Sequence, residues 1–243
     1  MYDIVDSVSE NRQPITDNAR EARTDPARIK KMFGAIAARY DRANTVLSGG
    51  IHHLWRRRVV RRAGVRVGDK VLDCATGTGD LAIRFAKKGA TVIGTDFTPE
   101  MIELARAKAP SIRFEVADVT SLPYEDNSFD IASIGFGIRN VADPAKGIAE
   151  MARVAKKVVI LEFGQPRNAV LSAFYKFYCR NFLPGFGGIV TGNRAAYEYL
   201  EFSSAHFPSG PKFVELMQRS AKFESIEFEP LTFGVAWLYI GIR

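Results

Sequence analysis

Cysteine and histidine are scarce in this sequence, with two cysteines and three histidines among 243 residues. Cys74 and Cys179 lie far apart and lack the spacing of metal ligands, a pattern typical of a protein of the reducing cytoplasm. No apolar run approaches the roughly 18 residues that a membrane-spanning helix requires, and no signal peptide is recognisable. These absences argue against a disulfide scaffold, and we expect a cytoplasmic protein without a membrane span or a bound metal.

Acidic residues are outnumbered: 34 Lys and Arg against 27 Asp and Glu give a net charge of +7. Such an excess fits a nucleic-acid partner, an anionic membrane surface or simply a soluble basic protein. No RNA-binding module is recognisable, so we expect no nucleic acid. Residues 1–25 are polar with little periodicity and predict a mobile tail. Residues 26–243 suffice for one α/β domain.

One stretch organises the chain, the sequence VLDCATGTG from Val71 to Gly79. Val71 and Leu72 predict a buried strand, and Gly77 and Gly79 permit a tight turn that approaches a ligand closely. The apolar positions that follow continue at helical spacing. A strand, a glycine loop and a helix are typical of a small-molecule site, but the same glycines also satisfy the fingerprint of a dinucleotide site.

Three acids at the ends of successive strands favour one cofactor over the other. Asp96 ends the second strand, where a carboxylate can accept hydrogen bonds from both hydroxyls of a ribose, which NAD and S-adenosylmethionine share. Asp73 lies where a ligand ammonium group needs a carboxylate, whereas it would repel the pyrophosphate of NAD. Asp118 follows the third strand, at the expected adenine edge. The three acids fit a cationic sulfonium nucleoside, so we expect S-adenosylmethionine.

Apolar runs alternate with helical patterns along the chain. We expect strands near 70–74, 91–96, 112–116, 129–134 and 157–163, helices near 79–88, 99–108 and 144–156, and a closing helix near 211–221 with strands near 225–231 and 235–242. Such alternation predicts a parallel, doubly wound sheet with right-handed crossovers. Ligands then lie beyond the carboxyl ends of the strands.

Four stretches combine into a more specific pattern. They are MFGAIAARYDRANTVLSGGIHHLWRR from Met32, VLDCATGTGDLA from Val71, FGIRNVAD from Phe136 and LEFGQP from Leu161. This pattern resembles the ubiquinone/menaquinone biosynthesis C-methyltransferases, a family of class I methyltransferases, from about Lys30 to the end of the chain. Other methyltransferases share the glycine loop but do not usually carry YDxxN, GIHxxW and FGIRN together. The chain departs from the family pattern at Thr76, at Gly135 and near Lys156.

The resemblance implies an α/β, Rossmann-like class I methyltransferase fold. Its doubly wound sheet would have seven mostly parallel strands with an antiparallel edge, and residues 26–66 would form an N-terminal helical cap. Residues 164–210 would form a lid insertion on the acceptor side, although core packing also explains their aromatic spacing. The candidate cofactor-binding residues are Tyr40, Asp73, Gly77, Thr78, Gly79, Asp96, Phe97, Asp118, Val119 and Gly135.

The resemblance also implies the reaction, methylation of a ring carbon that turns demethylmenaquinol, a lipophilic quinol, into menaquinol. Arg139 and Asn140 follow the fourth strand and are expected beside the acceptor. There Arg139 would favour the phenolate of the reduced ring, and Asn140 would orient a hydroxyl or a water molecule. Asp41 and His52 are alternative proton acceptors. The structural alternatives are a loop salt bridge for Arg139 and a helix-end acid for Asp41.

Some alternatives stay open at this level. The chain could methylate another lipophilic or phenolic molecule, or be a non-catalytic methyltransferase-like binding protein, although the retained acids favour an enzyme. A basic helix would carry Arg56, Arg57, Arg58, Arg61 and Arg62. Its face is either solvated or in peripheral contact with anionic lipid at the inner face of the cell membrane. The sequence does not distinguish naphthoquinone from benzoquinone acceptors, the tail length, or a monomer from a homodimer.

Overall fold

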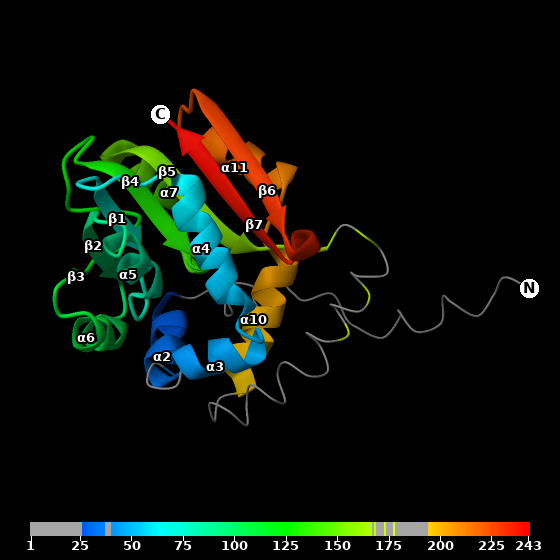
Figure 1. The fold of residues 1–243 in the computed structure, drawn as a ribbon. Coiled ribbons are helices and arrows are strands. Elements are labelled where there is room, and N and C mark those ends of the chain that lie inside the picture. The colour runs from blue at the N-terminus through cyan, green and yellow to red at the C-terminus, as the bar shows by residue number, and fades with distance from the viewer. Residues whose placement is uncertain (1–25, 37–39, 167, 169–172, 174–176, 178–193) are drawn as a thin grey trace, which may run out of the picture.

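The computed structural model describes residues 26–36, 40–166, 168, 173, 177 and 194–243, and a single sheet forms its centre. The strands are β1 (Lys70–Cys74), β2 (Thr91–Asp96), β3 (Arg113–Val116), β4 (Phe129–Gly135), β5 (Ala155–Phe163), β6 (Ser225–Leu231) and β7 (Ala236–Ile242). They pair in the order β3-β2-β1-β4-β5-β7-β6 (Figure 1). Strands β1 to β5 are parallel, whereas β7 runs antiparallel to β5 and β6. The predicted doubly wound sheet with an antiparallel edge is therefore confirmed.

Helices cover both faces of this sheet. One face carries α4 (Ile51–Ala63), α5 (Asp80–Ala86) and α6 (Pro99–Lys108), and the other carries α7 (Pro144–Val154) and α11 (Pro211–Ser220). Helices α6, α7 and α11 each begin with a proline, whose φ already suits a helix and whose missing N–H costs no hydrogen bond there. In the part of the chain that the structure describes, no helix has the length and apolar character to cross a membrane.

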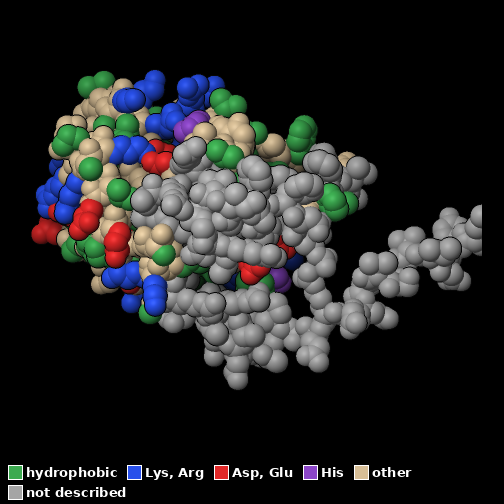
Figure 2. Space-filling view, turned by 90° about the horizontal axis from the view of Figure 1, so that it is seen from below, with side chains coloured by type: hydrophobic (Ala, Val, Ile, Leu, Met, Phe, Trp, Pro, Cys, Tyr) green, Lys and Arg blue, Asp and Glu red, His purple; other side chains and the backbone are tan. Residues whose placement is uncertain are grey.

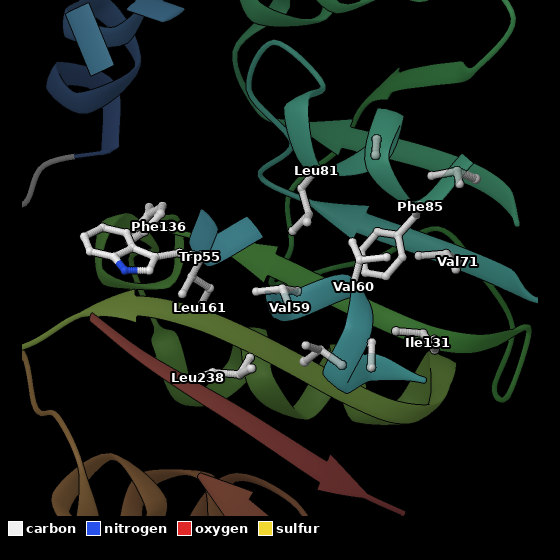
Figure 3. Close-up of a cluster of buried hydrophobic side chains, with 14 of the residues drawn as sticks. Trp55, Val59, Val60, Val71, Leu81, Phe85, Ile131, Phe136, Leu161 and Leu238 are labelled. Carbon is white, nitrogen blue, oxygen red and sulfur yellow. The ribbon is translucent and has the colours of Figure 1, made fainter. Parts of the chain in front are cut away.

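The core divides between the two faces because successive strand residues point in opposite directions. On one face Val71, Ile131 and Leu161 pack against the α4 and α5 side chains Val59 and Phe85 (Figure 3). The alternate strand positions pack against α7 and α11 on the other face. Two fully buried clusters thus fix the sheet between its helices and hold the strand ends in a constant arrangement.

A further layer lies at the carboxyl ends of the strands. It consists of α2 (Pro26–Ile36), α3 (Tyr40–Leu47), α10 (Arg194–His206) and the short 3-10 helix η2 (Ile138–Asn140), with a second such helix, η3 (Thr232–Gly234), between β6 and β7 (Figure 1). Helices α2 and α3 fall in the predicted cap. The predicted tail and about half of the predicted lid, including Gly185, Gly187 and Gly188, lie outside the described residues.

Two predicted helix ends were wrong. The predicted helix 144–156 ends at Val154, because Ala155 already pairs with Phe129 and the chain enters β5 without a connecting turn. The predicted helix 79–88 is shorter, because Gly79, with a φ of 85°, precedes the start of α5 and residues 87–89 form a turn after its end.

Candidate functional site

The glycine loop after β1 turns sharply because several of its residues have a positive φ. The angle is 46° at Ala75, 57° at Gly77 and 85° at Gly79. A Cβ atom on Gly79 would lie 2.9 Å from the Cζ atom of Phe114, so only glycine fits there. The backbone therefore comes close to the ends of β2 and β3.

Asp73 holds this loop from the inside. Its Oδ1 accepts a hydrogen bond from the Ser133 hydroxyl at 2.7 Å, and its Oδ2 accepts from the Thr76 hydroxyl at 2.6 Å and from the Ala82 N–H at 3.1 Å. Burial raises the pKa of Asp73 to about 6, although these hydrogen bonds oppose the rise. Only 1% of the residue is exposed. The carboxylate thus joins β1, β4, the loop and α5.

Asp96 is also buried, but, unlike Asp73, it lines a cavity. Its Oδ2 accepts from the Gly77 N–H and its Oδ1 from the Thr98 N–H, both at 2.9 Å. Burial raises the pKa of Asp96, and the backbone donors oppose this rise. Each carboxylate oxygen can accept a further hydrogen bond. The geometry therefore fits a ligand with two neighbouring hydroxyl groups.

A cavity opens in front of Asp96. It is lined by Ala75, Gly77, Asp96, Phe97, Thr98, Met101, Ala117, Asp118, Val119, Gly135, Phe136, Gly137, Asn140, Val141 and Ala142. Six of the ten predicted cofactor-binding residues are among them: Gly77, Asp96, Phe97, Asp118, Val119 and Gly135. Asp73, Thr78 and Gly79 lie behind the lining, and the side chain of Tyr40 is outside the described residues. Asn140 is the one predicted catalytic residue in the lining.

Phe136 and Gly137 shape the cavity wall after β4. Phe136 has a φ of 59°, which is unusual for a residue with a side chain. The centroid of its ring lies 4.3 Å from that of the Phe163 ring and 5.8 Å from that of the Trp55 ring. A Cβ atom on Gly137 would lie 2.6 Å from the Cβ atom of Ala75. The absence of a side chain at Gly137 therefore lets this wall meet the glycine loop.

Arg139 is buried and bound within the protein. Its Nη1 lies 2.8 Å from the Oε1 of Glu162, and the two side chains are 5% and 2% exposed. The guanidinium also donates to the Phe136 carbonyl at 2.6 Å and to the Ser203 hydroxyl at 3.3 Å, and it lies 5.1 Å from the centroid of the Phe163 ring. This placement matches the structural alternative, a salt bridge in the loop, and keeps Arg139 out of the cavity lining.

Asn140, the next residue, faces the cavity. Its Oδ1 accepts a hydrogen bond from the Tyr199 hydroxyl at 2.9 Å. Tyr199 belongs to α10, as does Ser203, which contacts Arg139. Helix α10 thus bonds both side chains that the sequence placed on the acceptor side.

Asp41 joins the cap to the glycine loop. Its Oδ1 accepts from the Thr78 hydroxyl at 2.5 Å, and its Oδ2 lies 2.6 Å from Lys108 Nζ. Lys108 is also 2.6 Å from Asp80, which lies 3.5 Å from Arg56. These charges form a network between α3, α4, α5 and α6. Asp41 does not line the cavity, so the network is its observed role.

His52 is buried beside the same network. Its Nδ1 lies 2.6 Å from the Ser48 hydroxyl oxygen, and burial, with the charge of Arg56 next in importance, lowers the pKa of His52 to about 4. The side chain is therefore neutral at pH 7 and outside the cavity lining. His52, His53 and Asp80 are the one group among the described residues whose ligand atoms come together, within 4.8 Å. The bonds of Asp80 to cations oppose metal binding there.

The comparisons with known proteins agree with this geometry. A family model described as the ubiE/COQ5 methyltransferase family matches residues 20–243. The chain belongs to this family. It is 54% identical to the ubiquinone/menaquinone biosynthesis C-methyltransferase UbiE of Bdellovibrio bacteriovorus, over 89% of this chain and 96% of the relative. It is 40% identical to the demethylmenaquinone methyltransferase of Deinococcus radiodurans, over 96% of this chain and 98% of that one.

A solved structure supports the fold alone. Phosphoethanolamine N-methyltransferase 2 of Haemonchus contortus, in complex with S-adenosyl-L-methionine, superposes with a TM-score of 0.58 at 16% identity, covering 78% of this chain and 52% of that chain. The predicted family, the methyltransferase class and the class I fold are thus confirmed for this member of the ubiE/COQ5 family.

Sequence reasoning missed several residues of the site. Thr98, Met101, Ala117, Val141 and Ala142 line the cavity without having been predicted. The position of Met101, one turn into the helix after Asp96, was a usable signal because the start of that helix faces the strand ends. Glu162 and Tyr199 gave no such signal, since each acts through a bond to a distant residue.

Proposed function

We propose that this protein transfers the methyl group of S-adenosylmethionine to a ring carbon of a reduced polyprenyl quinone precursor, converting demethylmenaquinol to menaquinol. Membership of the ubiE/COQ5 family and relatives named demethylmenaquinone methyltransferase support this activity. The observation that carries it in the structure is one cavity that joins Asp96 and Asp118 on one side to Asn140 on the other.

The residues of the cavity fit the cofactor. Asp96 would accept hydrogen bonds from the two ribose hydroxyls, since both of its oxygens retain acceptor capacity. Asp118 and Val119 would meet the adenine, and Gly77 and Gly135 would allow the methionine part to approach the backbone. Bound S-adenosylmethionine supplies an electrophilic methyl group that replaces a ring hydrogen, which leaves as a proton, while sulfur keeps the electrons of the broken S–C bond.

On the acceptor side the chain's residues would orient the ring and exclude water. A reduced ring is nucleophilic at carbon when a phenolic oxygen is ionised, and Asn140 is the polar side chain placed to meet that oxygen. Phe136 supplies apolar surface beside it. Arg139 would act through its bond to the Phe136 carbonyl, by holding the loop that carries these two residues.

The test uses labelled S-adenosylmethionine and a short-tailed demethylnaphthoquinone, with and without dithionite. We expect label on a ring carbon, found by mass spectrometry, and only in the presence of the reductant. Label on oxygen would make the protein an O-methyltransferase. Equal rates with the oxidised quinone would refute the phenolate mechanism. A parallel assay with a demethylated benzoquinol separates the two ring classes.

We also propose peripheral contact with an anionic membrane, through a basic groove rather than the whole basic helix. Arg56 is buried, while Arg58 and Arg62 pair with Glu229 and Glu227. The groove between α4 and α5 is lined by Leu54, Arg57, Arg58, Val60, Arg61, Gly64, Val65, Arg84, Lys87 and Lys88, with no acid. Figure 2 shows Lys and Arg side chains gathered at the upper and left edges of the face that it presents. Each basic residue near an anionic surface contributes about 1 kcal/mol.

Liposome sedimentation tests this contact. Binding should require anionic lipid, weaken with ionic strength and fall in Arg57→Ala/Arg61→Ala. The variant Arg113→Ala/Lys156→Ala removes the same charge elsewhere and should bind normally. Equal loss of binding in both variants would contradict the role of the groove.

Light scattering would test the hypothesis of a homodimer. The division into tail, cap and lid remains a prediction.

A further inference from the structure

We propose that Tyr199 is a positioning residue that turns the Asn140 amide so that its NH2 group faces the acceptor. This inference rests on the proposed function, because it assigns a donor to the ring oxygen of the quinol. Tyr199 lies in α10, far from the glycine loop in sequence and absent from the motifs that identify the family. It acts through Asn140 and does not line the cavity itself.

The orientation follows from the asymmetry of an amide. One end, Oδ1, accepts hydrogen bonds, and the other end, Nδ2, donates them. The Tyr199 hydroxyl donates to Oδ1 at 2.9 Å and so engages the accepting end. Within the described residues Nδ2 donates to no protein acceptor. The donor end is therefore left for a ligand in the cavity that Asn140 lines.

The Tyr199 hydroxyl keeps the proton that it donates to Asn140. Burial raises the pKa of Tyr199. The positive charge of Arg139 opposes this rise, and the negative charge of Glu162 adds to it. The hydroxyl is therefore protonated throughout the neutral range. The acids that line the cavity with Asn140 are Asp96 and Asp118.

A fixed donor has a chemical consequence for the acceptor. An N–H group binds an anionic oxygen more strongly than a neutral one, so it favours the phenolate over the phenol. It also favours rings that place an oxygen near the methylated carbon. An amide turned the other way would present Oδ1 and would stabilise the protonated phenol instead. Tyr199 thereby helps to set both the ionisation of the substrate and its placement.

The experiment compares Tyr199→Phe with Tyr124→Phe. The control loses a hydroxyl bonded to Glu115 at 2.6 Å, away from the cavity. In Tyr199→Phe we expect kcat to fall about fivefold, the effect of one hydrogen bond, with unchanged cofactor affinity and the rising limb of the pH–rate profile moved to higher pH. Tyr124→Phe should keep the profile of the unmodified protein. Unchanged kcat and pH profile in Tyr199→Phe would overturn the proposal.

A double variant tests whether Tyr199 acts through Asn140. Tyr199→Phe should have no further effect on kcat in the Asn140→Ala background, because the amide to be oriented is absent. If the loss of kcat in the double variant equals the product of the losses in the two single variants, the proposal is overturned. Asn140→Asp keeps an acceptor for Tyr199 but replaces the donor by a negative charge. It should lose more activity than Tyr199→Phe, and an equal or smaller loss would contradict the donor role.

Binding of 1-naphthol separates this inference from the proposed function. Its neutral and ionised forms have different absorption spectra, so the pKa of the bound phenol is measurable without turnover. The unmodified protein should lower that pKa relative to free 1-naphthol, and Tyr199→Phe should lower it less. An equal effect in both proteins refutes the inference even if a quinol is methylated. Failure of the unmodified protein to methylate any quinol refutes the proposed function even if the naphthol result holds.

Discussion

The two sides of the cavity are built differently. On the proposed cofactor side, Asp96 is held by backbone N–H groups of Gly77 and Thr98, both close to strand ends. On the proposed acceptor side, Asn140 and the neighbouring Arg139 are held by side chains from distant segments, Tyr199 and Glu162. Backbone donors remain in place when side chains vary, whereas a side-chain pair is lost with either partner. The cofactor side should therefore tolerate substitutions nearby, and the acceptor side should be sensitive to single changes far along the chain.

The largest expected effect is a loss of stability when the buried ion pair of Arg139 and Glu162 is disrupted. Glu162→Gln leaves Arg139 as an unpaired charge that is almost fully buried, and this should lower the free energy of unfolding by about 3–5 kcal/mol. Adding Arg139→Met should recover part of the loss, because no buried charge is then unpaired. Urea denaturation measures both. Glu227→Gln, in an exposed pair with Arg62, should cost less than about 1 kcal/mol. Similar losses in the two Gln variants would contradict the difference in burial.

The next largest effect is a loss of cofactor affinity when Asp96 is replaced. Asp96→Ala removes a carboxylate that lines the cavity, and S-adenosylmethionine binding should weaken by about 1.5–3 kcal/mol, the contribution of hydrogen bonds to a charged group. Calorimetry with the cofactor and its demethylated product measures this. Asp130→Ala, an acid paired with Lys156 outside the cavity, should bind normally. Unchanged affinity in Asp96→Ala would show that the ribose lies elsewhere.

A smaller effect concerns pH at the junction of cap and site. The pKa of His52 is lowered to about 4 in the folded protein, so the unfolded chain binds a proton more readily. The stability contributed by the neutral ring is complete above its usual pKa near 6.5 and is lost as the pH falls toward 4. Between pH 7 and pH 4 the unmodified protein should lose up to about 2 kcal/mol more than His52→Gln, because the buried ring takes up a proton less readily than the ring in the unfolded chain. Thermal unfolding at several pH values tests this, and parallel curves would contradict the buried, neutral state.

The smallest expected effect is on stability and kcat when Asp41 is replaced. Asp41→Asn keeps an acceptor for Thr78 and loses the ion pair with the partly exposed Lys108, so stability should fall by less than about 1 kcal/mol. Because Asp41 lies outside the cavity lining, kcat should change by less than about fivefold. Loss of a proton acceptor would instead reduce kcat by about 10²–10⁴-fold. Single-turnover kinetics with a quinol distinguishes the two outcomes.

The predictability of the site follows the same division. Gly77, Asp96 and Asp118 were predicted because each lies at a strand end beside its own turn, and local sequence determines both the strand and the turn. The structure brings all three to the cavity. Arg139, Asp41 and His52 were also expected near the chemistry, yet none of them lines the cavity, and each is bonded within the protein. Proximity in a motif does not determine which way a side chain points.

By itself, the sequence determined the order of strands and helices, the parallel doubly wound sheet, and the glycine loop with its acids, because periodicity and turn residues act over a few positions; the antiparallel edge was expected from the family resemblance. Only the tertiary structure decided that Asp73 holds the loop from within, that Glu162 neutralises Arg139, and that Tyr199 orients Asn140. Partners such as Tyr199 and Asn140 are separated by 59 residues. Their contact depends on the packing of α10 against η2, so no local pattern records it.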